Sequence, residues 1–165
     1  MNINESLQHF QAGVENINAA ISKIPPEAID FMPTRADDWT IRQHIIHLVE
    51  SEINNFIRIK SCIAQPGSNA YVIDELEWVK NLENRKESVE DYLAVFALLR
   101  KILLSFLKTV PESDFTEKYF YRNYQNENRK LSLLDDLALY ARHVDFHIEY
   151  ISKIMAEYEQ SHIKA

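Results

Sequence analysis

Residues 40–62 read TIRQHIIHLVESEINNFIRIKSC and form the stretch that decides the fold. Apolar side chains recur every three or four residues along it, which predicts a helix with one buried face. Thr40 and Gln43 have the spacing of a capping box, in which each side chain satisfies a free backbone amide at the start of a helix. We therefore expect an amphipathic helix from about Thr40 to about Cys62. Its apolar positions are Ile41, Ile45, Leu48, Ile53, Phe56, Ile57 and Ile59.

Three further stretches share this periodicity. Pro25 and Pro26 end the first of them, because neither residue can donate a helical hydrogen bond. Ser88 and Ser132 each stand three residues before an aspartate, an arrangement typical of a helix N-terminus. The predicted helices cover residues 4–23, 40–62, 88–110 and 132–159, with a loop at 65–70, a short helix at 74–82 and an aromatic segment without helical spacing at 112–130.

Four long amphipathic helices bury their apolar faces most simply against one another. The sequence therefore predicts an all-α protein built as a four-helix bundle. No internal repeat, low-complexity segment or change of composition marks a domain boundary, and 165 residues suit one domain. We expect a single domain over residues 1–165.

The composition excludes several other classes of protein. Only two residues are glycine, whereas sheets joined by tight turns, dinucleotide-binding fingerprints and phosphate-binding loops need glycine where the backbone turns sharply. The single cysteine excludes an internal disulfide and a cysteine-rich metal site. The sequence contains neither an 18-residue apolar run nor the pattern of a secretory signal. We therefore expect a cytoplasmic protein with no membrane partner.

The charge balance argues against nucleic-acid binding. Asp and Glu number 25 against 18 Lys and Arg, which gives a formal net charge of -7. Binding to phosphates needs clustered basic side chains, so no nucleic-acid partner is expected. The densest basic sites are three pairs, interpreted as solvated helix faces: Arg85-Lys86, Arg100-Lys101 and Arg129-Lys130.

His143 and His147 lie four residues apart in the last predicted helix. This spacing places both imidazoles on one face a turn apart, as two ligands of one metal ion require. On a helical wheel the pair flanks the apolar stripe, where polar groups often line a cleft between helices. The alternative is a pair of partly buried histidines that hydrogen-bond to neighbouring groups.

The remaining histidines occupy different settings. His44 is interpreted as a structural residue that packs on Trp39 beside the helix cap. His47 lies roughly opposite the apolar stripe of its helix, so either it is exposed or this side of the helix faces a site. Periodicity leaves both possibilities open. His9 and His162 show no pattern and are interpreted as solvated.

Residues 39–48, WTIRQHIIHL, resemble the W-[ST]-x(6)-H-L signature that opens the second helix of the DinB-like four-helix proteins. Residues 143–151, HVDFHIEYI, resemble the closing H-x-x-x-H segment of that family, and SVEDYL at 88–93 opens the third helix in the same order. The resemblance covers nearly the whole chain. It implies an antiparallel DinB-like bundle that holds a divalent metal ion with three histidines. Matched position by position, these are His47, His143 and His147, whereas His44 matches no ligand.

The resemblance also implies a kind of chemistry. Three neutral imidazoles leave one metal position open for water or substrate, as catalytic sites do. Such a metal lowers the pKa of bound water or stabilises a thiolate. The family includes bacillithiol-dependent S-transferases and mycothiol-dependent isomerases. We therefore expect a metal-dependent thiol S-transferase or small-molecule hydrolase. Its cofactor would be zinc, nickel, iron or copper, its partners a small-molecule substrate and a low-molecular-weight thiol, and its assembly a homodimer.

Three residues near the implied ligands are candidates for orienting an imidazole or for acid–base work. Glu50 lies one turn after His47, and Asp136 and Tyr140 lie on the same flank of the last helix as the two histidines there. A carboxylate can orient an imidazole, and a phenol can donate to a bound oxyanion. A surface or packing role stays open for each of the three.

Two other functional classes also stay open. One is a non-catalytic helical bundle, linked to stress or dimerisation, whose metal is structural or vestigial. The other is a helical scaffold without a metal. The segment from Tyr119 to Tyr124 either lines a pocket or caps the bundle. Cys62 lies at the end of the second helix, outside the expected site, so a thiol in the reaction would have to come from a cosubstrate.

Overall fold

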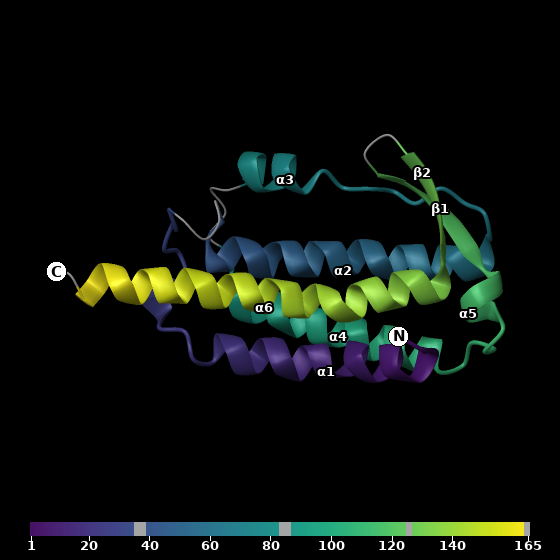
Figure 1. Cartoon of the computed structure of the whole chain (residues 1–165), viewed down its shortest axis with the longest axis horizontal. Helices are drawn as coiled ribbons and strands as arrows, with labels where there is room; N and C mark the ends of the chain where they lie inside the picture. Colours follow the sequence, from purple (N-terminus) through teal and green to yellow (C-terminus); the bar gives the residue numbers. More distant parts are fainter. Residues whose placement is uncertain (35–38, 83–86, 125–126, 164–165) are drawn as a thin grey trace.

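The structure is a computed structural model that describes residues 1–34, 39–82, 87–124 and 127–163. The predicted four-helix bundle is confirmed (Figure 1). Its long helices are α1 (Ile3–Ile21), α2 (Ile41–Ala64), α4 (Val89–Leu107) and α6 (Leu133–Ile163). The connecting segments contain the 3-10 helix η1 (Pro26–Ala28), the short helices α3 (Glu75–Leu82) and α5 (Asp114–Glu117), and the strands β1 (Tyr119–Tyr124) and β2 (Glu127–Ser132).

The four long helices run in two directions along the bundle (Figure 1). α1 and α6 run one way and α2 and α4 the other, so the neighbours α2 and α6 are antiparallel, as are α1 and α4. α2 and α4 are parallel neighbours, which requires the chain between them to return along the length of the bundle. The described part of this returning segment, which we call the crossover (residues 65–82), carries α3 along the outer side of α2.

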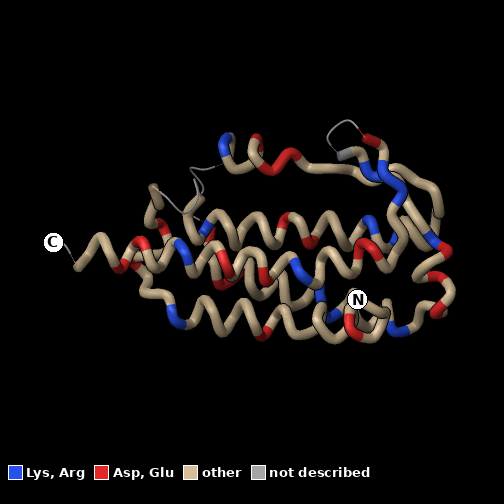
Figure 2. The backbone as a smooth tube through the Cα atoms, viewed as in Figure 1, with Lys and Arg blue, Asp and Glu red and all other residues tan. Residues whose placement is uncertain are grey.

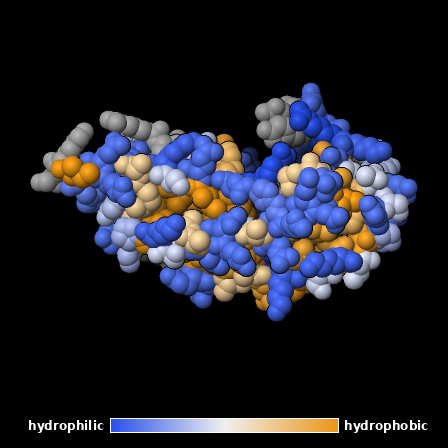
Figure 3. Space-filling model, turned by 60° about the horizontal axis from the view of Figure 1, so that its bottom comes forward, coloured by the Kyte–Doolittle hydropathy of each residue, from blue (hydrophilic) through white to orange (hydrophobic). Residues whose placement is uncertain are grey.

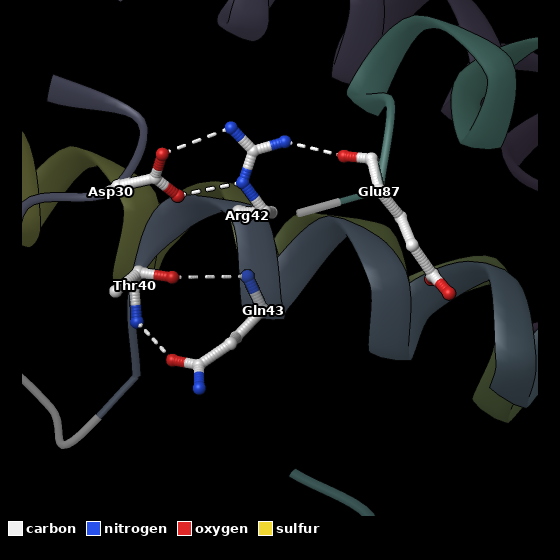
Figure 4. A network of polar contacts seen from close by, with 5 residues as sticks. All are labelled: Asp30, Thr40, Arg42, Gln43 and Glu87. Carbon is white, nitrogen blue, oxygen red and sulfur yellow. Dashed lines mark hydrogen bonds and ion pairs between the residues drawn. The ribbon is translucent and has the colours of Figure 1, made fainter. Parts of the chain in front are cut away.

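The predicted capping box at the start of α2 is present (Figure 4). The backbone N–H of Gln43 donates to Oγ1 of Thr40 at 3.2 Å, and that of Thr40 donates to Oε1 of Gln43 at 2.8 Å. Arg42 adds three hydrogen bonds from the same turn, since its Nε and Nη2 donate to the carboxylate of Asp30 and its Nη1 donates to the carbonyl oxygen of Glu87. These contacts fix the beginning of α2 against the segments that precede α2 and α4.

A buried ion pair divides the core into two apolar clusters. Arg100 of α4 is 2% exposed, and its Nε donates to Oε2 of the fully buried Glu52 at 3.0 Å. Its Nη1 and Nη2 donate to the carbonyl oxygens of Phe10 and Tyr140 at 2.8 and 2.7 Å. One guanidinium therefore joins α4 to the other three long helices. The clusters on its two sides include Phe10, Ile59, Leu103 and Leu137, and Ile17, Ile45, Phe96 and Val144.

The prediction of solvated helix faces is wrong for two of the three basic pairs. Arg100 is buried because Glu52 and two backbone carbonyls satisfy its guanidinium. Arg129 and Lys130 are exposed, but they lie in strand β2. The third pair, at 85–86, lies outside the described residues. The pattern of charges near Arg100 in the sequence could not predict its burial, because the carboxylate that pairs with Arg100 lies on another helix.

The low glycine content led us to exclude sheets joined by tight turns, and this prediction is wrong because β1 and β2 form a hairpin. Its strands pair antiparallel, with Phe120 opposite Leu131 and Arg122 opposite Arg129. Phe120 is 1% exposed and packs in one of the two apolar clusters. Within the aromatic segment at 112–130, residues 114–117 form the short helix α5, and residues 119–124 lack helical spacing because they follow the two-residue period of a strand. The exclusion was wrong because several hairpin loops need no glycine.

Both glycines stand where a side chain would disturb the structure. Gly67 has a φ of +83°, in the left-handed region that disfavours residues with a Cβ. A Cβ at Gly13 would lie 2.3 Å from Nη1 of Arg100. The guanidinium therefore approaches the backbone of α1 closely because residue 13 has no side chain.

The long helices turn polar faces outward. Figure 3 shows hydrophilic side chains over most of the face in view, with apolar areas between them. Within the ranges that the structure describes, no helix combines the length and the apolar character needed to cross a lipid bilayer. The apolar stripes of the four long helices are instead buried against one another.

Candidate metal centre

Three histidines from two helices converge on one side of the bundle. His47 comes from α2, and His143 and His147 come from α6. One nitrogen of each ring lies within 4.8 Å of the corresponding nitrogens of the other two. His47 and His147 are 5% and 2% exposed, and His143 is half-buried. His47, for which periodicity left two possibilities open, is therefore buried beside the two histidines of α6 and is not exposed.

His147 lies at the centre of a row of imidazoles. Its Nε2 is 3.0 Å from Nε2 of His143, and its Nδ1 is 2.9 Å from Nδ1 of His44. A neutral imidazole carries one donor and one acceptor nitrogen. A metal bound through Nε2 of His147 would leave its Nδ1–H to donate to His44, which would fix the orientation of the ring.

His44 has one predicted contact and one that the sequence did not predict. Its ring packs on Trp39 with centroids 5.3 Å apart, as expected for a residue beside the helix cap. Its hydrogen bond to His147 joins α2 to α6 and was missed, because the partner is distant in the sequence. The spacing of His44, three residues before His47, was the available signal for a role at this site.

Burial keeps these imidazoles neutral at pH 7. Desolvation, together with the neighbouring His44, lowers the pKa of His47 to about 4. Desolvation first, and then the neighbouring His47 and three nearby arginines, lower the pKa of His143 to about 3. The pKa of His147 also lies well below its ordinary value, mainly because the ring is buried and secondly because of the other histidines. Each ring therefore offers a lone pair without having to lose a proton first.

The three rings fit a divalent metal ion. Nitrogen ligands about 2.0–2.1 Å from a tetrahedral ion lie about 3.4 Å apart, which small side-chain rotations would reach from the present separations. Nδ1 of His143 is buried and has no hydrogen-bond partner among the described residues. A set of three neutral nitrogen ligands suits zinc, nickel, iron or copper and leaves a coordination position for another molecule.

Two cavities open beside the histidines. A cavity of about 220 Å³ is lined by all three rings and by Glu75 of α3. A larger cavity of about 450 Å³ extends from His143 to the hairpin, and Glu75 also lines it. Oε2 of Glu75 lies 3.9 Å from Nε2 of His47. The sequence did not point to Glu75, because α3 reaches the histidines only through the path of the crossover.

Tyr140 lies beside the histidines, as predicted from its flank of the last helix. Its ring contacts that of His143 with centroids 5.6 Å apart. Its hydroxyl group shares a hydrogen bond of 3.2 Å with Oγ of Ser51, and both residues line the larger cavity. The phenol is therefore placed to meet a ligand in this cavity.

Asp136 and Glu50 occupy different positions from Tyr140. Asp136 is fully buried, and its Oδ2 accepts a hydrogen bond of 3.1 Å from Nε of Arg58. Its carboxylate therefore neutralises a core arginine. Glu50 is half-buried on α2, and a role for it in orienting an imidazole stays a prediction.

Cys62 lies in an apolar cluster, away from the three histidines, and is fully buried. Burial raises the pKa of its thiol to about 11. Only the thiolate reacts with Ellman's reagent, and in the native protein this thiol is both buried and largely protonated at pH 8. We therefore expect the reagent to modify it at least about 100-fold more slowly in the native protein than in guanidinium chloride. Absorbance of the released thiolate measures both rates. Equal rates would contradict the burial of Cys62.

The chain belongs to the DinB superfamily, whose family model matches residues 9–151. Among its relatives is a protein of Bacillus licheniformis with the provisional name of a metal-dependent hydrolase, 27% identical over 135 residues that cover 82% of this chain and 74% of the relative. Another is YfiT of Bacillus subtilis, also named provisionally as a metal-dependent hydrolase, 27% identical over 74% of this chain and 67% of the relative.

The solved structure of Bacillus subtilis YfiT shares the fold of this chain. The two superpose with a TM-score of 0.82 over 92% of this chain and 84% of the other, at 23% identity. That protein is described as a "probable metal-dependent hydrolase with an unusual four-helix bundle topology". At this identity the likeness establishes the shared bundle and no more.

Proposed function

We propose that this chain is a metal-dependent enzyme of the thiol S-transferase or small-molecule hydrolase type. Its divalent metal ion would be held by His47, His143 and His147. The observation that carries the proposal is the convergence of three neutral imidazoles at a cavity of about 220 Å³, beside a larger cavity of about 450 Å³ that His143 also lines. The relatives named as metal-dependent hydrolases support the metal dependence.

The metal, when bound, would supply a Lewis acid that lowers the pKa of water or of a thiol. The residues of the chain would position the reacting groups. The hydroxyl group of Tyr140, hydrogen-bonded to Ser51, is placed to donate to a substrate oxygen in the larger cavity. Glu75 lines both cavities and is half exposed, so its carboxylate can accept a proton and exchange it with solvent.

A thiol for the reaction would come from a separate small molecule, since Cys62 is buried elsewhere. We therefore propose a low-molecular-weight thiol as cosubstrate. A cytoplasmic location suits this proposal, because that compartment keeps thiols reduced. The homodimer stays a prediction.

Metal content and turnover test the proposal together. We expect protein purified without an affinity tag to carry a stoichiometric divalent metal. We also expect it to consume an electrophile such as chlorodinitrobenzene with a small thiol, or to cleave an activated ester. His47→Ala and His143→Ala should lose both metal and turnover, because each removes one of three ligands. His162→Ala, at an exposed position near the end of α6, is the matched control.

Two other outcomes have definite meanings. Wild-type protein without a stoichiometric metal would refute the proposed function. A tightly bound metal whose removal lowers the melting temperature, without turnover of any thiol or ester, would instead support the non-catalytic bundle with a structural metal.

A further inference from the structure

The larger cavity ends at a pair of arginines on the hairpin. Arg122 of β1 and Arg129 of β2 are opposite one another in the register of the hairpin, and both line the cavity. Side chains alternate along a strand, so these arginines share the inner face of the hairpin with Phe120 and Leu131, which pack on the core. Figure 2 shows the basic residues of the hairpin beyond the beginning of α3, whose first turn carries acidic residues.

The two guanidinium groups add two positive charges to this face of the hairpin, and the buried carboxylate of Asp136 lies near enough to Arg122 to interact with its charge. Like charges opposite one another in a hairpin destabilise it. Arg129 pairs with Glu127 at 2.9 Å. Nε of Arg122 is buried and has no hydrogen-bond partner among the described residues. A buried donor left without an acceptor costs free energy, and an anion that met this donor after a rotation of the arginine side chain would recover that cost.

The other residues that line the larger cavity indicate what kind of molecule would carry the anionic group. Leu131 and Leu139 supply apolar wall, while Ser51 and Tyr140 supply hydroxyl groups. His143 and Glu75 lie at the opposite end, beside the candidate metal centre. A volume of about 450 Å³ lies within the range of small-molecule sites.

We propose that this cavity binds a small molecule with a carboxylate on an apolar body, with the carboxylate paired to Arg122. The planar fork of a guanidinium matches the two oxygens of a carboxylate. Glu75 disfavours a second negative charge at the other end, so the ligand is oriented with its carboxylate toward the hairpin. Its uncharged end then points toward His143. Reaction of that end rests on the proposed function, whereas the pairing with Arg122 does not.

Isothermal titration with two probes of equal shape tests this subsite. Phenylacetate carries the charge, and phenylacetamide is its neutral counterpart. We expect metal-free wild-type protein to bind phenylacetate about tenfold more tightly, as a charge-assisted hydrogen bond predicts. Arg122→Gln should abolish this preference. Lys130→Gln, on the same hairpin but on its outer face, should preserve it.

Further variants separate this subsite from the metal centre. Arg122→Lys keeps the charge without the fork and should give an intermediate preference, while circular dichroism verifies that each variant is folded. His47→Ala alters the candidate metal centre without touching the lining of the larger cavity, and should keep the preference. The protein could prove unable to bind a divalent metal and still prefer phenylacetate to phenylacetamide in a way that depends on Arg122. This result would support the subsite and refute the proposed function.

Three results would overturn the proposal. One is equal affinity of wild-type protein for the two probes, and another is no binding of either probe. The third concerns a repeat of the titration with metal-loaded protein: binding of phenylacetate only in the presence of the metal and His47, unaffected by Arg122→Gln, would mean that the carboxylate binds the metal. The proposed function would survive this last result.

Discussion

Replacing Arg100 by methionine is expected to lower the free energy of unfolding by about 3–5 kcal/mol. The change leaves the carboxylate of Glu52 fully buried, with Asn55 as its remaining hydrogen-bond donor. It also removes the donors to the carbonyl oxygens of Phe10 and Tyr140. Urea unfolding followed by circular dichroism measures the difference from wild type.

Two further variants show whether the loss comes from the ion pair. The double variant Glu52→Leu/Arg100→Met removes both charges and should recover most of the stability, because no buried charge is left unpaired. Lys101→Met changes the exposed neighbour and should alter the free energy of unfolding by less than about 0.5 kcal/mol. If Arg100→Met and Lys101→Met had the same small effect, the ion pair would not stabilise the core.

Binding of a divalent metal is expected to stabilise the protein by about 4 kcal/mol when the free metal exceeds its dissociation constant about 1,000-fold. For a chain of this size, that corresponds to a rise in melting temperature of about 8–16 °C. The effect arises because the three histidines converge only in the folded state. Thermal unfolding with excess zinc, compared with unfolding after chelation by EDTA, measures the shift.

His147→Ala should abolish this shift, since its ring lies between His143 and His44 at the centre of the row. His162→Ala should keep the full shift, because that residue is exposed and lies away from the site. An equal shift in the two variants would mean that zinc stabilises the protein at a different place.

The bundle could be predicted because its determinants are local. Each long helix shows its apolar period within its own sequence, and the caps at Thr40, Ser88 and Ser132 are made by residues three positions away. The convergence of the three histidines needed more than periodicity. Periodicity left His47 open, and the resemblance to a family supplied its partners on α6.

The remaining features depend on contacts between distant parts of the chain. Glu75 reaches the histidines because the crossover returns along α2, and Arg122 lines the cavity because of the register of the hairpin. Arg100 is buried because Glu52 lies opposite it on another helix. Neither helical period nor local charge encodes such pairings, so these residues could not be assigned before the structure.

The path of the crossover also divides the candidate ligands between two halves of the chain. His47 belongs to the half with α1 and α2, and His143 and His147 belong to the half with α4 and α6. A metal ion at this place would be a cross-link between the two halves. If the backbone were cut within the crossover, neither fragment would hold a complete set of ligands. Retention of the ion would then report the reassembly of the bundle.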